Sequence, residues 1–150
     1  LLPELRRLNS ALPQNSYEVK LSTYGAGQTS SRRLNIKKDL EHSVKDRTLV
    51  LVEDLLDTGF TLDSYRDELY HRGAVDVLTV ILIDKPALRE RRDGHPVITA
   101  DISGLRYDGV WWLYGCGMDI DGDENTRNLP YIGKAPPPNT FKQVGHNFNA

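Results

Sequence analysis

Apolar residues recur along the first part of the chain at the spacings of both helices and strands. Leucines at helical spacing over residues 1–12, with Pro3 in the first turn, predict a helix. Apolar and polar residues alternate over residues 17–21, which predicts a strand with one polar face. Residues 22–31 are rich in Gly, Ser, Thr and Gln, and this composition predicts a mobile loop.

Two apolar runs flank a second helical pattern in the middle of the chain. Residues 49–52 are apolar at every position, which predicts a strand buried on both faces of a parallel sheet. Apolar positions over residues 62–69 fall on one helical face, and Gly73 suits the end of that helix. Residues 75–83 form the second run, so these segments together predict a strand–helix–strand unit.

Shorter patterns follow towards the end of the chain. Residues 110–114 combine apolar and aromatic side chains and predict a strand, and residues 131–132 predict a very short one. Residues 136–150 predict a tail that is loose or lies on the surface. The alternation of strands and helices predicts an α/β fold with a mainly parallel sheet.

Composition narrows the class of protein without changing the predicted fold. The length of 150 residues suits one domain over 1–150, and 39% hydrophobic with 27% charged residues is ordinary for a soluble globular protein. The formal net charge of −2 gives no general attraction to nucleic acid or to a membrane surface. A single cysteine, Cys116, fits a reducing compartment, so we expect a cytoplasmic protein in which Cys116 is a packing residue.

Three acids follow the apolar run of residues 49–52, where the pattern places the change from a buried strand to a turn. They are Glu53, Asp54 and Asp57. Carboxylates in such a place cost free energy unless a cation or hydroxyl groups meet them. The adjoining turn, Asp57–Thr61, precedes a helix and offers backbone N–H groups and hydroxyls to an anion. A ribose 5-phosphate suits both features, and the competing interpretation is a capped helix with solvated acids.

The segment Val50–Leu62, VLVEDLLDTGFTL, resembles the phosphoribosyl-pyrophosphate (PRPP) signature of type I phosphoribosyltransferases. Three further segments are similar to the hypoxanthine-guanine branch of that family: Ser22–Gly25, Ile83–Pro86 and Arg127–Gly133. They occur in the family's order, so the resemblance covers about residues 15–134. It implies a type I phosphoribosyltransferase fold, with a mainly parallel sheet flanked by helices and a small hood region.

The resemblance implies roles at the ribose-phosphate end of the site. Glu53 and Asp54 would hold the ribose hydroxyls, directly or through Mg²⁺, and Asp119 would approach a second Mg²⁺. Asp57 would be the general base near N7 of the purine. The 5-phosphate would lie in a turn made by Asp57, Thr58, Gly59, Phe60 and Thr61.

It also implies roles at the base and at the leaving group. Lys85 would donate to the 6-oxo group, and Trp112 would stack on the purine ring, with Trp111 as the alternative. Arg127 would reach pyrophosphate. The loop that closes over the site would contain Ser22, Thr23 and Tyr24.

The activity implied by the resemblance is purine salvage. The 5-phosphoribosyl group would pass from PRPP to N9 of hypoxanthine or guanine, giving IMP or GMP and pyrophosphate, with Mg²⁺ offsetting the charge of the leaving group. The implied partners are PRPP, a 6-oxopurine, a purine nucleotide and further copies of the chain in a homodimer or homotetramer. The alternative is a regulatory module of the same fold that binds PRPP or nucleotide without turnover. The retained Asp57 favours the enzyme, because a sensor needs no base, whereas the missing N-terminal loop favours the regulatory module.

Several positions depart from the family pattern or have a simpler interpretation. Phe60 stands where relatives often carry lysine, and the family places a strand and a pyrophosphate-binding loop before its first helix, so we expect an N-terminal part to be missing. Lys85 could be a surface lysine, and residues 89–92 and 37–38 are predicted to be solvated basic faces. The acids of residues 119–124 are predicted to form a solvated turn, because the glycine falls at the wrong place for a calcium loop.

Overall fold

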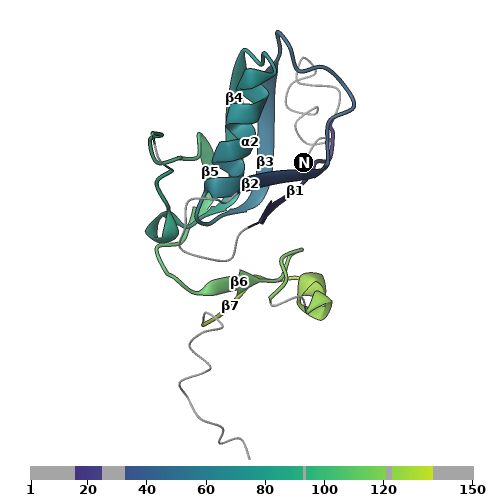
Figure 1. The fold of residues 1–150 in the computed structure, drawn as a ribbon. Coiled ribbons are helices and arrows are strands. Elements are labelled where there is room, and N and C mark those ends of the chain that lie inside the picture. The colour runs from purple at the N-terminus through teal and green to yellow at the C-terminus, as the bar shows by residue number, and fades with distance from the viewer. Residues whose placement is uncertain (1–15, 25–32, 93, 121–122, 137–150) are drawn as a thin grey trace, which may run out of the picture. The chain divides into compact units, whose positions relative to one another are not determined.

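The computed structural model describes residues 16–24, 33–92, 94–120 and 123–136 (Figure 1). The chain divides into two compact units, one of Leu1–Leu49 with Thr61–Val77 and one of Val50–Phe60 with Leu78–Ala150. In chain order the elements are β1 (Lys20–Tyr24), β2 (Arg33–Lys38), β3 (Thr48–Leu56), α2 (Phe60–His71), β4 (Asp76–Asp84), η1 (Pro86–Leu88), β5 (Ile102–Arg106), β6 (Trp112–Tyr114), η2 (Glu124–Asn128) and β7 (Gly133–Ala135). The predicted helix over residues 1–12 and the tail beyond residue 136 lie outside the described residues.

Strands β1 and β2 form an antiparallel pair in the first unit. Leu21 lies opposite Ile36, and Tyr24 lies opposite Arg33. The prediction of a loop from Ser22 onward was therefore wrong for residues 22–24, because pairing with β2 satisfies the backbone groups of these polar residues. Strand β2 was not predicted, although Leu34 and Ile36 alternate with polar residues.

Helix α2 follows the predicted pattern closely. Its buried residues are Leu62, Asp63, Tyr65 and Leu69, so the apolar stripe is the inner face. Gly73 has φ +90°, and the amide of Ala74 donates to the carbonyl of Leu69 at 3.0 Å. This is the hydrogen bond of a helix end that requires a left-handed residue, which glycine supplies at least cost.

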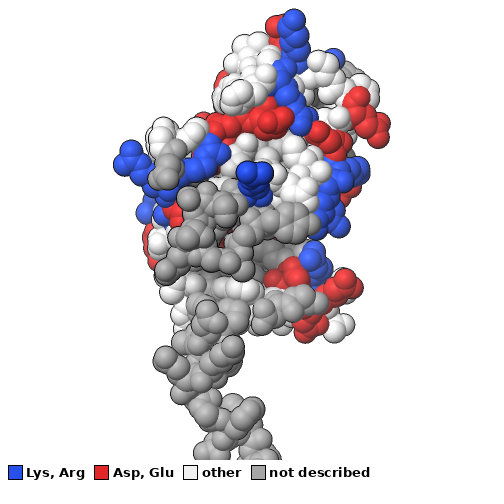
Figure 2. Space-filling view, viewed as in Figure 1, with Lys and Arg blue, Asp and Glu red and all other residues white. Residues whose placement is uncertain are grey.

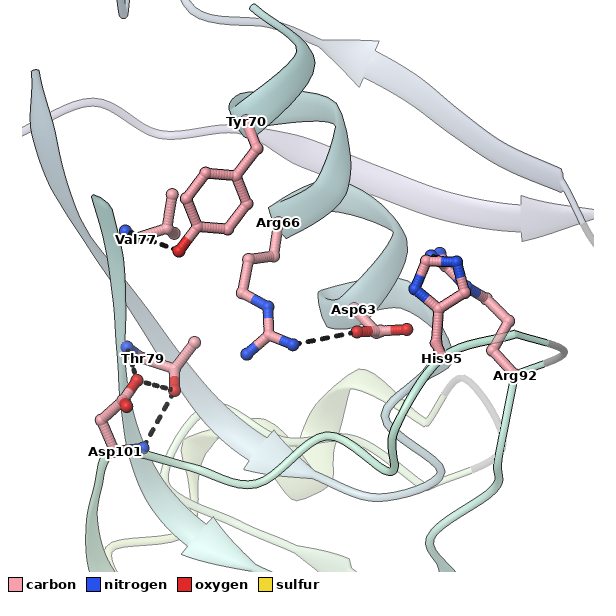
Figure 3. A network of polar contacts seen from close by, with 8 residues as sticks. All are labelled: Asp63, Arg66, Tyr70, Val77, Thr79, Arg92, His95 and Asp101. Carbon is pink, nitrogen blue, oxygen red and sulfur yellow. Dashed lines mark hydrogen bonds and ion pairs between the residues drawn. The ribbon is translucent and has the colours of Figure 1, made fainter. Parts of the chain in front are cut away.

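The two strands that flank α2 in the sequence, β3 and β4, are neighbours in a three-stranded sheet of order β3-β4-β5. Strands β4 and β5 run parallel, with Val80 opposite Ile102 and Ile83 opposite Leu105. The α/β class is therefore confirmed. Strand β5 was not predicted, and its start is attached to β4 by a side-chain bond network: the amide and hydroxyl of buried Thr79 both donate to the Asp101 carboxylate at 2.7 Å (Figure 3).

The core of the second unit lies next to the carboxyl end of this sheet. Ile83, Leu113 and Met118 form a buried cluster against which Leu55 and Tyr107 pack. Strand β6 contributes Leu113 and pairs antiparallel with β7. The short strand predicted at residues 131–132 was misplaced, because the pairing with β6 begins at Gly133.

The charged side chains on the surface are of both signs. Basic and acidic side chains are interspersed on the face drawn in Figure 2, in line with the formal net charge of −2. Residues 37 and 38 are exposed, as predicted, and Lys38 pairs with Glu18 at 3.0 Å. Of the helices in the described part of the chain, none has the length and apolar composition needed to cross a membrane.

Candidate active site

The turn between β3 and α2 has a backbone that only glycine adopts comfortably. Gly59 has φ +85°, and a Cβ at this position would lie 2.4 Å from Cγ2 of Ile98. Helix α2 begins at the next residue, Phe60, whose amide lies 3.5 Å from the Thr58 hydroxyl. A tight turn that leads into a helix N-terminus presents backbone N–H groups and the positive end of the helix dipole to an anion.

Asp57, at the start of this turn, pairs with Lys85. The Lys85 ammonium lies 3.4 Å from Oδ2 of Asp57, and the lysine side chain is only 1% exposed. The alternative prediction of a surface lysine is therefore wrong. A buried ammonium needs a partner to offset lost hydration, and Asp57 supplies it.

The second oxygen of Asp57 has an unusual environment. Oδ1 is buried and has no hydrogen-bond partner among the described residues. A buried acceptor without a donor costs free energy, so its persistence calls for a reason. The pair thus offers a cation and an unused acceptor next to each other, at the ends of two neighbouring strands.

Glu53 and Asp54 lie within β3, which continues to Leu56. The prediction that these acids follow the end of the strand was wrong, because sheet pairing extends beyond the apolar run of residues 49–52. Both side chains reach solvent. Partial burial by neighbouring atoms nevertheless raises the pKa of the Glu53 carboxyl, and the negative charge of Asp54 raises it further. Two repelling carboxylates, hard oxygen donors of the kind that Mg²⁺ prefers, would be stabilised by a bound cation.

Arg127 and Asp119 are brought together by the loop that contains η2. The guanidinium donates to Oδ1 of Asp119 at 2.7 Å and to the carbonyl of Gly117 at 3.2 Å. Among the described residues, Asp119 does not join Glu53 and Asp54 in a group whose oxygens all lie within 4.8 Å of one another. Asp119 is therefore not grouped with the other two predicted metal ligands in this structure, and it pairs with the arginine.

The two tryptophans differ in their surroundings. Trp112 opens β6 and is half-buried, whereas Trp111 is 42% exposed and has the Lys134 ammonium 5.2 Å from its ring centroid. Cys116 was predicted to be a packing residue, and this was wrong. It is exposed with φ 51°, between two glycines that also have positive φ, so the turn directs it outward.

The remaining predicted residues belong to the other unit of the chain. Ser22, Thr23 and Tyr24 lie in β1, and residues 25–32 of the predicted closing loop lie outside the described residues. Thr61 is the second residue of α2.

The sequence analysis also missed Arg89, which was predicted to be solvated. Its side chain is 6% exposed and contacts Asp84 and the carbonyl of Asp57.

Comparison with known proteins decides the family. The phosphoribosyl transferase domain matches residues 14–121. The chain belongs to the phosphoribosyltransferase family. A hypoxanthine-guanine phosphoribosyltransferase from Lactococcus lactis is 38% identical over 120 residues, which cover 79% of this chain and 60% of the relative. A hypoxanthine phosphoribosyltransferase from Haemophilus influenzae is 32% identical, over 87% of this chain and 67% of its own.

The solved structures of phosphoribosyltransferases agree with the fold. A hypoxanthine phosphoribosyltransferase from Staphylococcus aureus superimposes with a TM-score of 0.67 and 32% identity, covering 82% of this chain and 62% of that one. This confirms the predicted phosphoribosyltransferase fold. The chain spans about three fifths of the length of these two relatives. The match covers 60% of the Lactococcus protein and 62% of the Staphylococcus protein.

Proposed function

We propose that the chain carries the 5-phosphoribosyl transfer site of a hypoxanthine-guanine phosphoribosyltransferase of purine salvage. In the proposed reaction the bond from N9 of the base to C1 of the ribose forms as the bond from C1 to pyrophosphate breaks. The products are IMP or GMP and pyrophosphate. We propose the cytoplasm as the compartment of this reaction.

The observation that carries the proposal is the pair of Lys85 and Asp57. A 6-oxopurine presents an acceptor at its 6-oxo group and a proton at N7, side by side. Lys85 would donate to the first, and the Asp57 carboxylate, whose side chain is 39% exposed, would accept from the second. Asp57 would then take the N7 proton as the base attacks, which is general-base catalysis.

The turn and β3 would supply the rest of the ribose-phosphate site. The turn at residues 57–61 would bind the 5-phosphate through backbone amides, so binding would not depend on the side chain at position 60, where relatives often carry lysine and this chain has Phe60. Glu53 and Asp54 would hold the ribose hydroxyls. Trp112 would stack on the base, since it is the half-buried member of the tryptophan pair.

The chemistry of the carboxylates fits a magnesium ion. Glu53 and Asp54 would hold the ion nearest the ribose, and Asp119 would hold a second one after releasing Arg127. Bound Mg²⁺ would supply neutralisation of the charge on the leaving pyrophosphate. Arg127 itself offers a forked donor that matches a phosphate group, so it would exchange Asp119 for pyrophosphate.

The test is a turnover assay with three bases. We expect IMP or GMP to form from PRPP, Mg²⁺ and hypoxanthine or guanine, as followed by chromatography of the nucleotide. Adenine should be rejected, because its 6-amino group is a donor and would meet the Lys85 ammonium. Transfer to adenine at a similar rate would refute the assignment of Lys85. Binding of PRPP and IMP without any turnover would instead support the regulatory module.

A further inference from the structure

Arg89 belongs to the basic run of residues 89–92. Among the contacts that the structure describes, it is the member of this run whose side chain is buried and hydrogen-bonded to the turn before α2. Its guanidinium donates to the carbonyl of Asp57 at 2.7 Å and forms an ion pair with the carboxylate of Asp84, the last residue of β4. The arginine is 6% exposed and Asp84 17% exposed. Its Cδ also lies 3.1 Å from the point where a Cβ on Gly59 would stand.

The backbone around Arg89 contacts the same turn. The amide of Lys85 donates to the carbonyl of Leu56 at 3.0 Å, and the amide of Glu90 donates to the carbonyl of Thr58 at 2.9 Å. Three successive carbonyls, those of residues 56, 57 and 58, therefore each accept a hydrogen bond from residues 85–90. Arg89 supplies the middle one through its side chain, whereas backbone amides supply the other two.

This arrangement has a consequence for the N–H groups of the turn. In a planar trans peptide the carbonyl of one residue and the N–H of the next point in opposite directions. Carbonyls held toward residues 85–90 therefore direct the amides of Asp57, Thr58 and Gly59 to the other side. That is the direction needed if those amides are to meet a ligand and not the protein interior.

We propose that Arg89 is a positioning residue, which holds the carbonyl of Asp57 inward so that the turn presents its amides to a phosphate group. The inference rests on the proposed function for the identity of that phosphate, the 5-phosphate of IMP or PRPP. Arginine suits the role because one planar fork reaches both the carbonyl and the Asp84 carboxylate. Asp84 in turn fixes the guanidinium to the end of β4.

The decisive comparison is between Arg89→Gln and Arg91→Gln. Residue 91 lies in the same basic run but is exposed, so its variant is the matched control. We expect Arg89→Gln to weaken IMP binding in calorimetry by about tenfold, as loss of one charged hydrogen bond allows. The KM for PRPP should rise similarly with a smaller change in kcat, because the turn binds the phosphate in both ground and transition states. Arg91→Gln should leave both values as they are.

Two further variants keep the inference testable if Arg89→Gln fails to fold. Arg89→Lys retains the charge but cannot reach both acceptors as a fork, so we expect an intermediate loss of IMP affinity. Asp84→Asn removes the anchoring charge and should give a partial loss of the same kind. Wild-type IMP affinity in both of these variants would overturn the proposal.

Hydrogen exchange separates this inference from the proposed function. In the Arg89 variants the amide of Glu90, which donates to the carbonyl of Thr58, should exchange about tenfold faster, while those of Ile81 and Ile83 in β4 keep their rates. If the wild-type protein binds neither IMP nor PRPP, the proposed function fails and exchange alone decides the role of Arg89. Unchanged exchange at Glu90, or equal acceleration in β4, would show that Arg89 does not position the turn.

Discussion

Lys85 and Asp57 form an ion pair in which the lysine is buried and the carboxylate is partly open. Their side chains are 1% and 39% exposed, with 3.4 Å between Nζ and Oδ2. The amide of Lys85 also donates to the carbonyl of Leu56, so the pair joins the ends of β3 and β4. The two groups proposed to recognise the purine are thus held in place by each other and by the sheet.

Asp57→Asn tests the general base. We expect kcat to fall by about 10²–10⁴-fold, the usual range for a general acid–base group, with little change in the Kd for PRPP. The reason is that asparagine keeps a hydrogen-bonding oxygen but cannot take the N7 proton. Steady-state kinetics and calorimetry check the two values, and Asp108→Asn, an exposed acid paired with Arg106, is the control. A variant that keeps more than half of the parent rate would remove Asp57 from the mechanism.

Lys85→Met tests recognition of the 6-oxo group. Loss of a charged hydrogen bond should weaken hypoxanthine and guanine binding by about 1.5–3 kcal/mol, while PRPP affinity stays nearly unchanged. Methionine fills much of the same volume but leaves Asp57 without its cation, and loss of one partner of a buried pair is destabilising. Because the Asp57 side chain is 39% exposed and can be hydrated, we expect a folded variant with a lowered melting temperature. Equal losses of affinity for base and PRPP would mean that Lys85 has a structural role; Lys45→Met, at an exposed lysine, is the control.

Gly59→Ala tests the geometry of the turn. A left-handed backbone costs a non-glycine residue about 1–2 kcal/mol, and overlap with Ile98 should add about 1–3 kcal/mol. Gly94→Ala is the matched control, because Gly94 has φ +77° but no atom within 4 Å of the point where its Cβ would stand. Chemical denaturation should show the larger loss for Gly59→Ala, together with weaker IMP binding. Similar losses in the two variants would show that Ile98 adjusts without cost.

Glu53→Gln tests the raised pKa of Glu53 through the pH dependence of stability. With a folded pKa above its usual value of 4.5, the native state holds this proton to higher pH than the unfolded chain does. Ionisation of Glu53 therefore lowers stability as pH rises through that window. We expect Glu53→Gln to be more stable than the parent at neutral pH, with the difference vanishing below about pH 4.5.

Thermal unfolding between pH 4 and pH 8, without ligand or Mg²⁺, measures this difference. Glu18→Gln is the control of opposite sign, because a hydrogen bond from Lys38 lowers the pKa of Glu18. A Glu53→Gln variant that is less stable than the parent at neutral pH would contradict the raised pKa of Glu53, which burial and the charge of Asp54 produce.

The sequence by itself determined the elements that depend only on residues close together along the chain. The stripe of Leu62, Tyr65 and Leu69 and the following Gly73 specify α2 and its end, because helix formation depends on residues three or four positions apart. The tight turn at residues 57–59 is likewise local, since Gly59 alone accepts its backbone. The long PRPP motif carried the family, which the comparisons then confirmed.

Tertiary structure alone decided which charged side chains turn inward. Arg89 and Arg91 look alike in the sequence, yet the first is bonded to Asp57 and Asp84 while the second is exposed. Sheet pairing likewise extended β3 through Glu53 and Asp54, and β1 through Tyr24. These outcomes depend on partners that lie far away along the chain, and no local spacing encodes the free energy of meeting them.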